Sequence, residues 1–135
     1  MVKIAYVAVV QTLPVLSNQT QFLLTQLIVN GESRDLPAEF NVIIFRFVQE
    51  ALSNVERHSQ ATEVQVSIDF DVDMIRLKVQ DNGKGFILPK PVGKLIADKK
   101  LGIIGMQERA SMMGGTFNIY SKPGEGTVVS LEFSA

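Results

Sequence analysis

The sequence predicts an α+β fold, a two-layer sandwich in which a mixed β-sheet carries helices on one face. Several short segments alternate apolar and polar residues with a period of two, which is typical of half-buried strands, and two longer segments show helical spacing. These segments follow the order strand, helix, hairpin, loop, helix, hairpin. That order favours helices packed against one sheet over an all-helical or all-strand fold.

The first strand is expected at Gln21–Val29, and the turn Asn30-Gly31-Glu32 closes it. Residues 1–20 are apolar, but no period assigns them to a helix or a strand. We leave them as an unassigned N-terminal boundary segment and place the domain at residues 21–135.

A long helix is predicted from Ala38 to His58, directly after Leu36-Pro37. Its apolar positions recur at helical spacing and form one stripe, which we expect to pack on the sheet. The stripe contains Phe40, Ile44, Phe47, Val48, Ala51 and Val55.

A hairpin should follow, with strands at Thr62–Phe70 and Met74–Asp81. In the second strand the apolar residues occupy alternate positions, and the same parity places Asp81 on the core side. A buried carboxylate is costly unless it finds hydrogen-bond donors. The alternative is an acid that turns to solvent where the strand ends in an Asn-Gly turn. This stretch alone does not choose between the two.

The C-terminal part begins with an irregular segment, Phe86–Lys100, which contains two prolines and four lysines. A helix over Leu101–Met113 should end at Gly114-Gly115. Two closing strands are expected at Thr116–Ser121 and Thr127–Phe133.

Composition excludes several classes of protein. The chain has 135 residues, 46% of them hydrophobic, and a net charge of −1 from 13 basic and 14 acidic residues, so it gives no support to a nucleic-acid-binding face. With no cysteine and one histidine, disulfides are excluded and a zinc site is not expected. No apolar run approaches the ~20 residues that a membrane-spanning helix needs.

Polar residues on the long helix form a row. Glu50 and Asn54 are spaced i, i+4, and Arg57 returns to the same edge. A carboxylate, an amide oxygen and a guanidinium in this order suit a hydrated Mg²⁺ and the phosphates that it neutralises. The alternative is an exposed ion pair on a helix edge.

Three glycine pairs follow the helix: Gly83 with Gly85, Gly102 with Gly105, and Gly124 with Gly126. Glycine lets a backbone approach a ligand closely, and the second pair opens a helix whose free N–H groups favour an anion. One pair alone is an ordinary turn, but three in this order are a specific pattern.

These motifs resemble the ATP-binding domain of the GHKL superfamily, which has the Bergerat fold. FRFVQEALSNVERHS (45–59) resembles the N box, QDNGKGF (80–86) the first glycine box, LGIIGMQERA (101–110) the second and GEGT (124–127) the third. The forms Glu-Ala-Leu-x-Asn and Gly-Met-x-Glu-Arg-Ala resemble the nitrate-sensor branch of sensor histidine kinases.

For the nucleotide base, the resemblance implies that Asp81 accepts a hydrogen bond from the adenine amino group. Thr127 would support the same end of the base through its hydroxyl. Gly83 and Gly85 would let the chain pass close to the nucleotide.

For the phosphates, the resemblance implies that Asn54 ligates Mg²⁺ and that Arg57 meets the phosphates. Gly102 and Gly105 would present N–H groups to them. Glu50 occupies the place of a general base in the related ATPases, and in a kinase it would polarise or orient the incoming histidine. His58 would either cap the helix as a cation or touch the nucleotide.

The resemblance further implies the catalytic domain of a two-component sensor histidine kinase, with Mg²⁺ and ATP as cofactors. It would donate the γ-phosphoryl group to a histidine on a separate dimerisation domain, since His58 is the only histidine, and would serve a response regulator indirectly. We expect a cytoplasmic domain of a membrane-anchored bacterial sensor, without direct membrane or nucleic-acid contact. The segment Phe86–Lys100 would be a lid over the nucleotide. Alternatives are an anti-sigma-factor-type serine kinase of the same fold or a degenerate interaction module.

Overall fold

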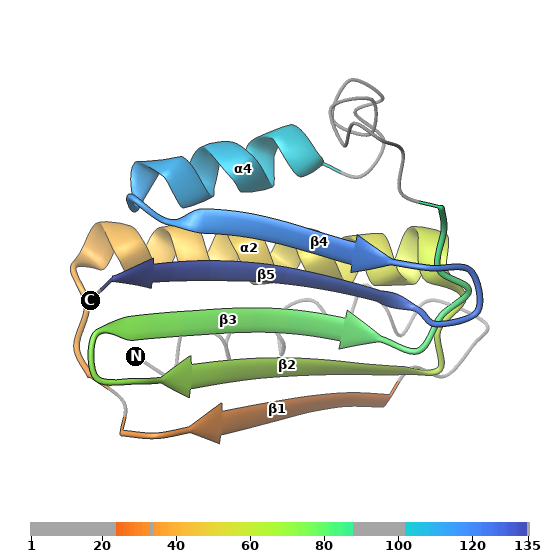
Figure 1. Ribbon diagram of the computed structural model, residues 1–135, viewed down its shortest axis with the longest axis horizontal. Helices are drawn as coiled ribbons and strands as arrows, with labels where there is room; N and C mark the ends of the chain where they lie inside the picture. Colours follow the sequence, from red (N-terminus) through yellow and green to blue (C-terminus); the bar gives the residue numbers. More distant parts are fainter. Residues whose placement is uncertain (1–23, 33, 88–101, 135) are drawn as a thin grey trace.

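The computed structural model describes residues 24–32, 34–87 and 102–134. One five-stranded sheet, in the order β1-β2-β3-β5-β4, forms one layer of the fold (Figure 1). The strands are β1 (Leu24–Asn30), β2 (Glu63–Phe70), β3 (Met74–Asp81), β4 (Thr116–Ser121) and β5 (Thr127–Ser134). All five predicted strands are present within a few residues of their expected ends. The first three residues of the expected first strand, residues 21–23, lie outside the described residues.

The sheet is mixed, as the sequence predicts. β1 runs parallel to β2, whereas the β2–β3, β3–β5 and β4–β5 pairs are antiparallel. The parallel pair requires a crossover, which α2 (Ala38–Asn54) provides between β1 and β2. In the β2–β3 hairpin Val64 pairs with Asp81, so the last residue of β3 is level with the start of β2.

The sequence predicts one continuous helix from Ala38 to His58, but α geometry ends at Asn54. After α2 the chain continues as a single π-helical turn, η1 (Val55–Ser59), and stops at Gln60, which has a left-handed backbone (φ +55°). The Ser59 hydroxyl donates to the carbonyl of Val55 at 2.6 Å. Such back-bonding by serine bends helices, and π-helical turns are frequent at functional sites.

Both helices pack on the same core. The predicted stripe of α2 is buried except for Phe40, which is half-buried, and α4 (Ile103–Met112) adds Ile103, Met106 and Ala110. Ring contacts join α2 to the sheet, with centroids 5.7 Å apart for Phe40–Phe133 and 6.2 Å for Phe47–Phe117. The α+β sandwich with helices on one side of the sheet is confirmed (Figure 1).

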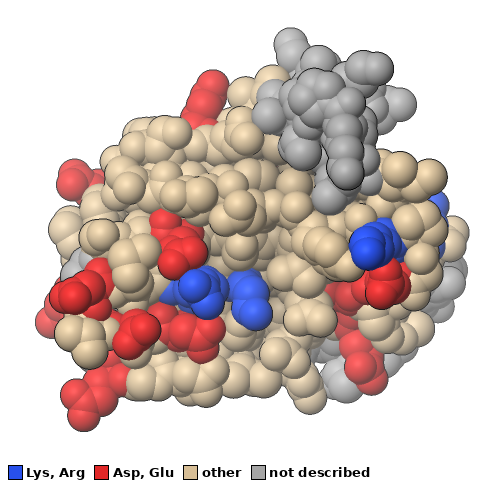
Figure 2. Space-filling model, in the orientation of Figure 1, with Lys and Arg blue, Asp and Glu red and all other residues tan. Residues whose placement is uncertain are grey.

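The face of the sheet opposite the helices is polar. Here Arg76 of β3 pairs with Glu132 of β5 at 3.1 Å. Figure 2 shows acidic side chains at both ends of this view, more of them at the left end, and the visible Lys and Arg side chains do not join into a continuous patch. No helix within the described ranges is both long enough and apolar enough to cross a membrane.

Candidate functional site

A cleft that opens to solvent on one side lies between the end of the long helix, the first residue of α4 and the strands β3, β4 and β5. Its walls are mostly apolar, with a few polar groups among them, which is the usual character of a small-molecule site. The lining residues are Ala51, Asn54, Val55, Ser59, Val79, Asp81, Gly85, Phe86, Ile103, Ile119, Thr127 and Val129.

Asp81 is the buried acid of this cleft. It is 7% exposed and lies on the core side of β3. The prediction from strand parity that Asp81 faces the core is therefore confirmed, and the alternative that it turns to solvent is wrong. Its Oδ1 accepts a hydrogen bond from the Gly83 N–H at 2.8 Å. Desolvation by burial raises the pKa of Asp81, and the backbone N–H groups of Gly83 and Thr127 offset part of that rise. The result is a desolvated hydrogen-bond acceptor in the wall of a mostly apolar cleft.

The loop after Asp81 is fastened to the end of the long helix. The Lys84 N–H donates to the carbonyl oxygen of Ser59 at 2.8 Å. A Cβ at Gly83 would lie 2.3 Å from that same oxygen, so only glycine fits there. Asn82 accepts from the backbone N–H groups of Thr62 and Glu63 at 3.0 Å and thereby closes the start of β2. Gly83 therefore has a packing role, and its predicted approach to a nucleotide stays a prediction.

Gly85, in contrast, lines the cleft itself. Its backbone is left-handed (φ +63°), and a Cβ would lie 2.0 Å from the carbonyl oxygen of Lys122. The same Cβ would lie 3.0 Å from the carbonyl oxygen of Gly126, so the first and third glycine motifs approach each other closely here. Both features require glycine.

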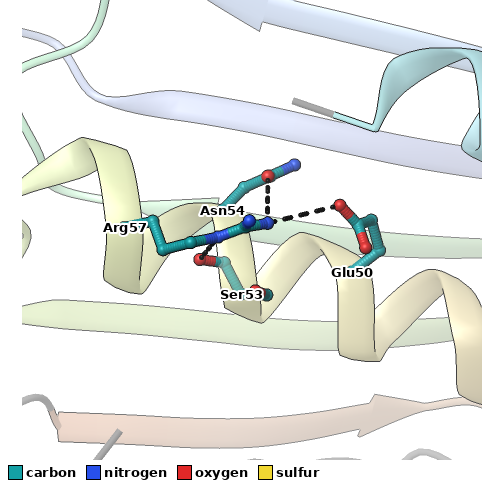
Figure 3. A network of polar contacts seen from close by, with 4 residues as sticks. All are labelled: Glu50, Ser53, Asn54 and Arg57. Carbon is teal, nitrogen blue, oxygen red and sulfur yellow. Dashed lines mark hydrogen bonds and ion pairs between the residues drawn. The ribbon is translucent and has the colours of Figure 1, made fainter. Parts of the chain in front are cut away.

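Glu50, Asn54 and Arg57 meet as the sequence predicts (Figure 3). Nη2 of Arg57 lies 3.4 Å from Oδ1 of Asn54 and 3.5 Å from Oε1 of Glu50, while Nε lies 3.4 Å from the carbonyl oxygen of Ser53. The Arg57 side chain is 49% exposed and the contacts are long, so each is weak. Together they place a positive charge between an amide oxygen and a carboxylate.

The start of α4 lies beside Glu50. Gly102 is the N-cap with φ +64°, no side chain caps it, and a Cβ there would lie 2.3 Å from Oε1 of Glu50. The Met106 N–H donates to the Gly102 carbonyl at 3.1 Å, so the N–H groups from Gly102 to Gly105 precede the first helical hydrogen bond. This end of the helix favours an anion.

The fold requires glycine less strictly at position 105 than at position 102. A Cβ there would meet only the Arg109 side chain, at 3.2 Å, and the position lacks a left-handed backbone. The roles of both glycines toward phosphates stay predictions.

Thr127 lines the cleft and is held by Ser121, a residue that the sequence reasoning missed. The two hydroxyl oxygens lie 2.9 Å apart. Ser121 also accepts from the Phe86 N–H at 2.9 Å and donates to the Gly126 carbonyl at 3.1 Å. The parity that located Asp81 would have found it, because Ser121 follows Phe117 and Ile119 on the same side of β4.

Two expectations fall outside the described part of the chain. The backbone of His58 belongs to η1, but its side chain lies outside the described residues, as do residues 88–100 of the expected lid.

The donor set fits Mg²⁺ better than zinc. Among the described residues, no group of three or more His, Cys, Asp or Glu side chains is placed to hold a metal. Mg²⁺ bound to a nucleotide typically takes only one or two protein oxygens and completes its shell with phosphates and water. The amide oxygen of Asn54 at the cleft is a suitable protein ligand.

Comparison with known proteins gives matches in one family. Residues 41–135 match the family described as histidine kinase-, DNA gyrase B-, and HSP90-like ATPases. The signal transduction histidine-protein kinase/phosphatase DegS of Bacillus subtilis is 39% identical over 104 residues, covering 76% of this chain and 26% of that protein. The sensor histidine kinase LiaS of the same species is 43% identical over 89 residues, covering 66% and 23%. The chain thus spans about a quarter of the length of these relatives.

Solved structures show the same fold. The histidine kinase domain of the blue-light activated histidine kinase of Erythrobacter litoralis aligns with a TM-score of 0.71 at 19% identity, covering 96% of this chain and 64% of that one. The histidine kinase AdeS of Acinetobacter baumannii aligns with a TM-score of 0.72 at 16% identity, covering 96% and 64%.

Proposed function

The chain belongs to the family of histidine kinase-, DNA gyrase B-, and HSP90-like ATPases, and on this premise we propose that it is the ATP-binding catalytic domain of a two-component sensor histidine kinase. The relatives named DegS and LiaS support the kinase class, as does the Glu-Ala-Leu-x-Asn form of the helix motif. The domain itself would extend over residues 21–135 and act in the cytoplasm.

The buried carboxylate of Asp81 carries this proposal. It is 7% exposed, in a cleft whose other walls are mainly apolar, and the N–H groups of Gly83 and Thr127 offset only part of its desolvation, so a further donor from a ligand would stabilise it. The amino group of adenine is such a donor, and the flat purine ring suits the apolar walls. Asp81 would thus fix the base, and Thr127 would support it from the neighbouring strand.

The phosphates would lie toward Asn54, Arg57 and the start of α4. Asn54 would hold Mg²⁺ through its amide oxygen, and Mg²⁺ supplies charge neutralisation on the phosphate oxygens when it is bound. Arg57 would turn from Asn54 and Glu50 toward the phosphates, which are stronger acceptors of a guanidinium. The N–H groups of Gly102 and Gly105 would add further donors.

The reaction is transfer of the γ-phosphoryl group to a histidine on a separate dimerisation domain. The imidazole nitrogen forms a bond to the γ-phosphorus while the bond to the β–γ bridging oxygen breaks, and ADP leaves. Positioning and charge stabilisation supply most of the catalysis in such transfers. Glu50, beside the start of α4, would orient or polarise the incoming histidine. A response regulator would receive the phosphoryl group afterwards.

Two other functions are weaker. A serine kinase of the same fold would place a hydroxyl where the histidine enters, and a degenerate module would not need the buried acid. The relatives and the intact cleft favour the histidine kinase.

Calorimetric titration with ATP, with and without Mg²⁺, tests the binding half of the proposal. We expect Mg²⁺-dependent ATP binding. Phosphorylation of a histidine-bearing dimerisation domain added in trans tests the transfer half. Absence of ATP binding by the folded chain would contradict the catalytic role and leave the degenerate module.

A further inference from the structure

Ser121 is a buried hydroxyl whose hydrogen-bonding capacity is fully used. It is 3% exposed and has three polar neighbours: the Phe86 N–H at 2.9 Å, the Gly126 carbonyl oxygen at 3.1 Å and the Thr127 hydroxyl at 2.9 Å. A serine hydroxyl has one proton to donate and two lone pairs to accept with. Three neighbours therefore match its three positions.

The direction of each bond follows from the chemistry of the neighbours. The Phe86 N–H can only donate and the Gly126 carbonyl can only accept, so the proton of Ser121 goes to Gly126. Gly126 is buried, and a buried carbonyl oxygen left without a donor is costly. The remaining lone pair of Ser121 then accepts from Thr127. Thr127 is the donor in the 2.9 Å contact between the two hydroxyls.

This direction has a consequence at the cleft. With its proton committed to Ser121, the Thr127 hydroxyl offers only lone pairs to a ligand. Asp81 is its neighbour across the β3–β5 ladder, one step beyond the Gln80–Val128 pair, and its carboxylate is likewise an acceptor. At this end of the cleft, both side chains therefore offer a ligand only hydrogen-bond acceptors.

We propose that Ser121 is a positioning residue that determines base specificity: it locks the Thr127 hydroxyl as an acceptor, so that the cleft takes a purine with a 6-amino group and rejects one with a 6-carbonyl group. A carbonyl oxygen facing these two acceptors finds no donor. Discrimination by an unsatisfied polar group is stronger than discrimination by shape alone. This inference rests on the proposed binding of ATP.

The test compares ATP with inosine triphosphate, which differs at the base only by carrying a 6-carbonyl and a protonated N1. The measured quantity is the ratio of the two dissociation constants. We expect the unmodified chain to prefer ATP strongly. In Ser121→Ala the Thr127 hydroxyl is free to rotate and donate to a carbonyl, so the ratio should fall about five- to tenfold, the scale of one neutral hydrogen bond.

A double-mutant cycle separates positioning from general structural damage. Thr127→Val removes the hydroxyl without changing side-chain shape, and Ser121→Ala should change the ratio no further in that background. Ser130→Ala is the matched control, because Ser130 lies on β5 on the opposite face of the sheet. If Ser121→Ala does not fold, Ser121→Cys keeps a side chain of similar shape with a much weaker acceptor and should show the same loss.

Equal weakening of both nucleotides in Ser121→Ala, with the ratio unchanged, would overturn the inference and leave Ser121 as a structural residue. An unchanged ratio in Ser121→Cys would do the same. Failure of the unmodified chain to bind ATP would instead remove the proposed function, on which the inference depends. ATP binding by the unmodified chain therefore tests the proposed function, whereas the ratio of dissociation constants in the Ser121 variants tests the role of Ser121.

Discussion

The carboxylate of Glu50 lies against Gly102, so close that a Cβ at Gly102 would stand 2.3 Å from Oε1 of Glu50. This contact joins the long helix to the start of α4 on the side of the cleft where we place the phosphates. An acid beside the N-terminus of a helix is stabilised by the N–H groups there, and an entering phosphate would use the same groups. Glu50 and the phosphates therefore share one electrostatic environment.

The first prediction concerns this contact. Gly102→Ala should destabilise the fold by ~1–2 kcal/mol, because a side chain in a left-handed backbone conformation is strained. It should also weaken ATP binding, because a Glu50 carboxylate forced off the start of α4 is no longer neutralised by the N–H groups there and would repel the phosphates beside it. Gly114→Ala is the control: its φ is +66°, close to the +64° of Gly102, but a Cβ there meets nothing within 4 Å. We expect a similar stability loss in urea unfolding without a loss of ATP affinity. Equal ATP affinities for the two folded variants would contradict the role assigned to the Glu50–Gly102 contact.

The second prediction concerns the affinity contributed by Asp81. Asp81→Asn should weaken ATP binding by ~1.5–3 kcal/mol, roughly 10- to 100-fold, because an amide cannot reproduce a charged acceptor. Calorimetry on the folded variant measures this loss. Asp69→Asn is a suitable control, since Asp69 lies on the opposite face of the same hairpin. Unchanged affinity in Asp81→Asn would refute the contact with adenine.

The third prediction concerns the effect of Asp81 on stability. Burial raises its pKa, so between the unfolded-state pKa and the higher folded-state pKa the folded chain holds more protons. The contribution of Asp81 to stability is therefore greatest below that window and is lost as the pH rises through it. Asp81→Asn removes this penalty, so its stability relative to the unmodified chain should rise from acid to neutral pH. Urea midpoints of both chains across this range test it, and a constant difference would contradict it.

The sequence predicts the parts of the site that depend on periodicity. The period of two locates Asp81 in the core, and the i, i+4 spacing brings Glu50, Asn54 and Arg57 together. It does not predict the π-helical turn, whose last residue, Ser59, accepts a hydrogen bond from the Lys84 N–H through its carbonyl oxygen. Lys84 is far along the chain from Ser59, and no local pattern reports such a contact. Strand parity places Ser121 in the core, but it does not predict the hydrogen bonds of Ser121 to Phe86 in the loop after β3, to Gly126 in the turn before β5 and to Thr127 at the start of β5.

The last prediction concerns Mg²⁺. If Asn54 ligates the ion, Asn54→Ala should remove most of the dependence of ATP binding on Mg²⁺ and leave adenosine binding nearly unchanged, because adenosine carries no phosphates. Alanine is a better helix former than asparagine, so the substitution is not expected to break α2. Ser53→Ala is the matched control, since Arg57 contacts the Ser53 carbonyl rather than its hydroxyl.

The Arg57 contact makes the Asn54 test sharper. Nη2 of Arg57 lies 3.4 Å from the Asn54 amide oxygen, the atom that Mg²⁺ would take, so ion and guanidinium compete for it. Arg57→Gln should then weaken ATP binding through the lost phosphate contact while preserving its dependence on Mg²⁺, the reverse of the Asn54→Ala pattern. Titrations of ATP and adenosine over a range of Mg²⁺ concentrations separate the two patterns. Equal losses of ATP and adenosine binding in Asn54→Ala would mean that Asn54 shapes the cleft as a structural amide rather than holding the ion.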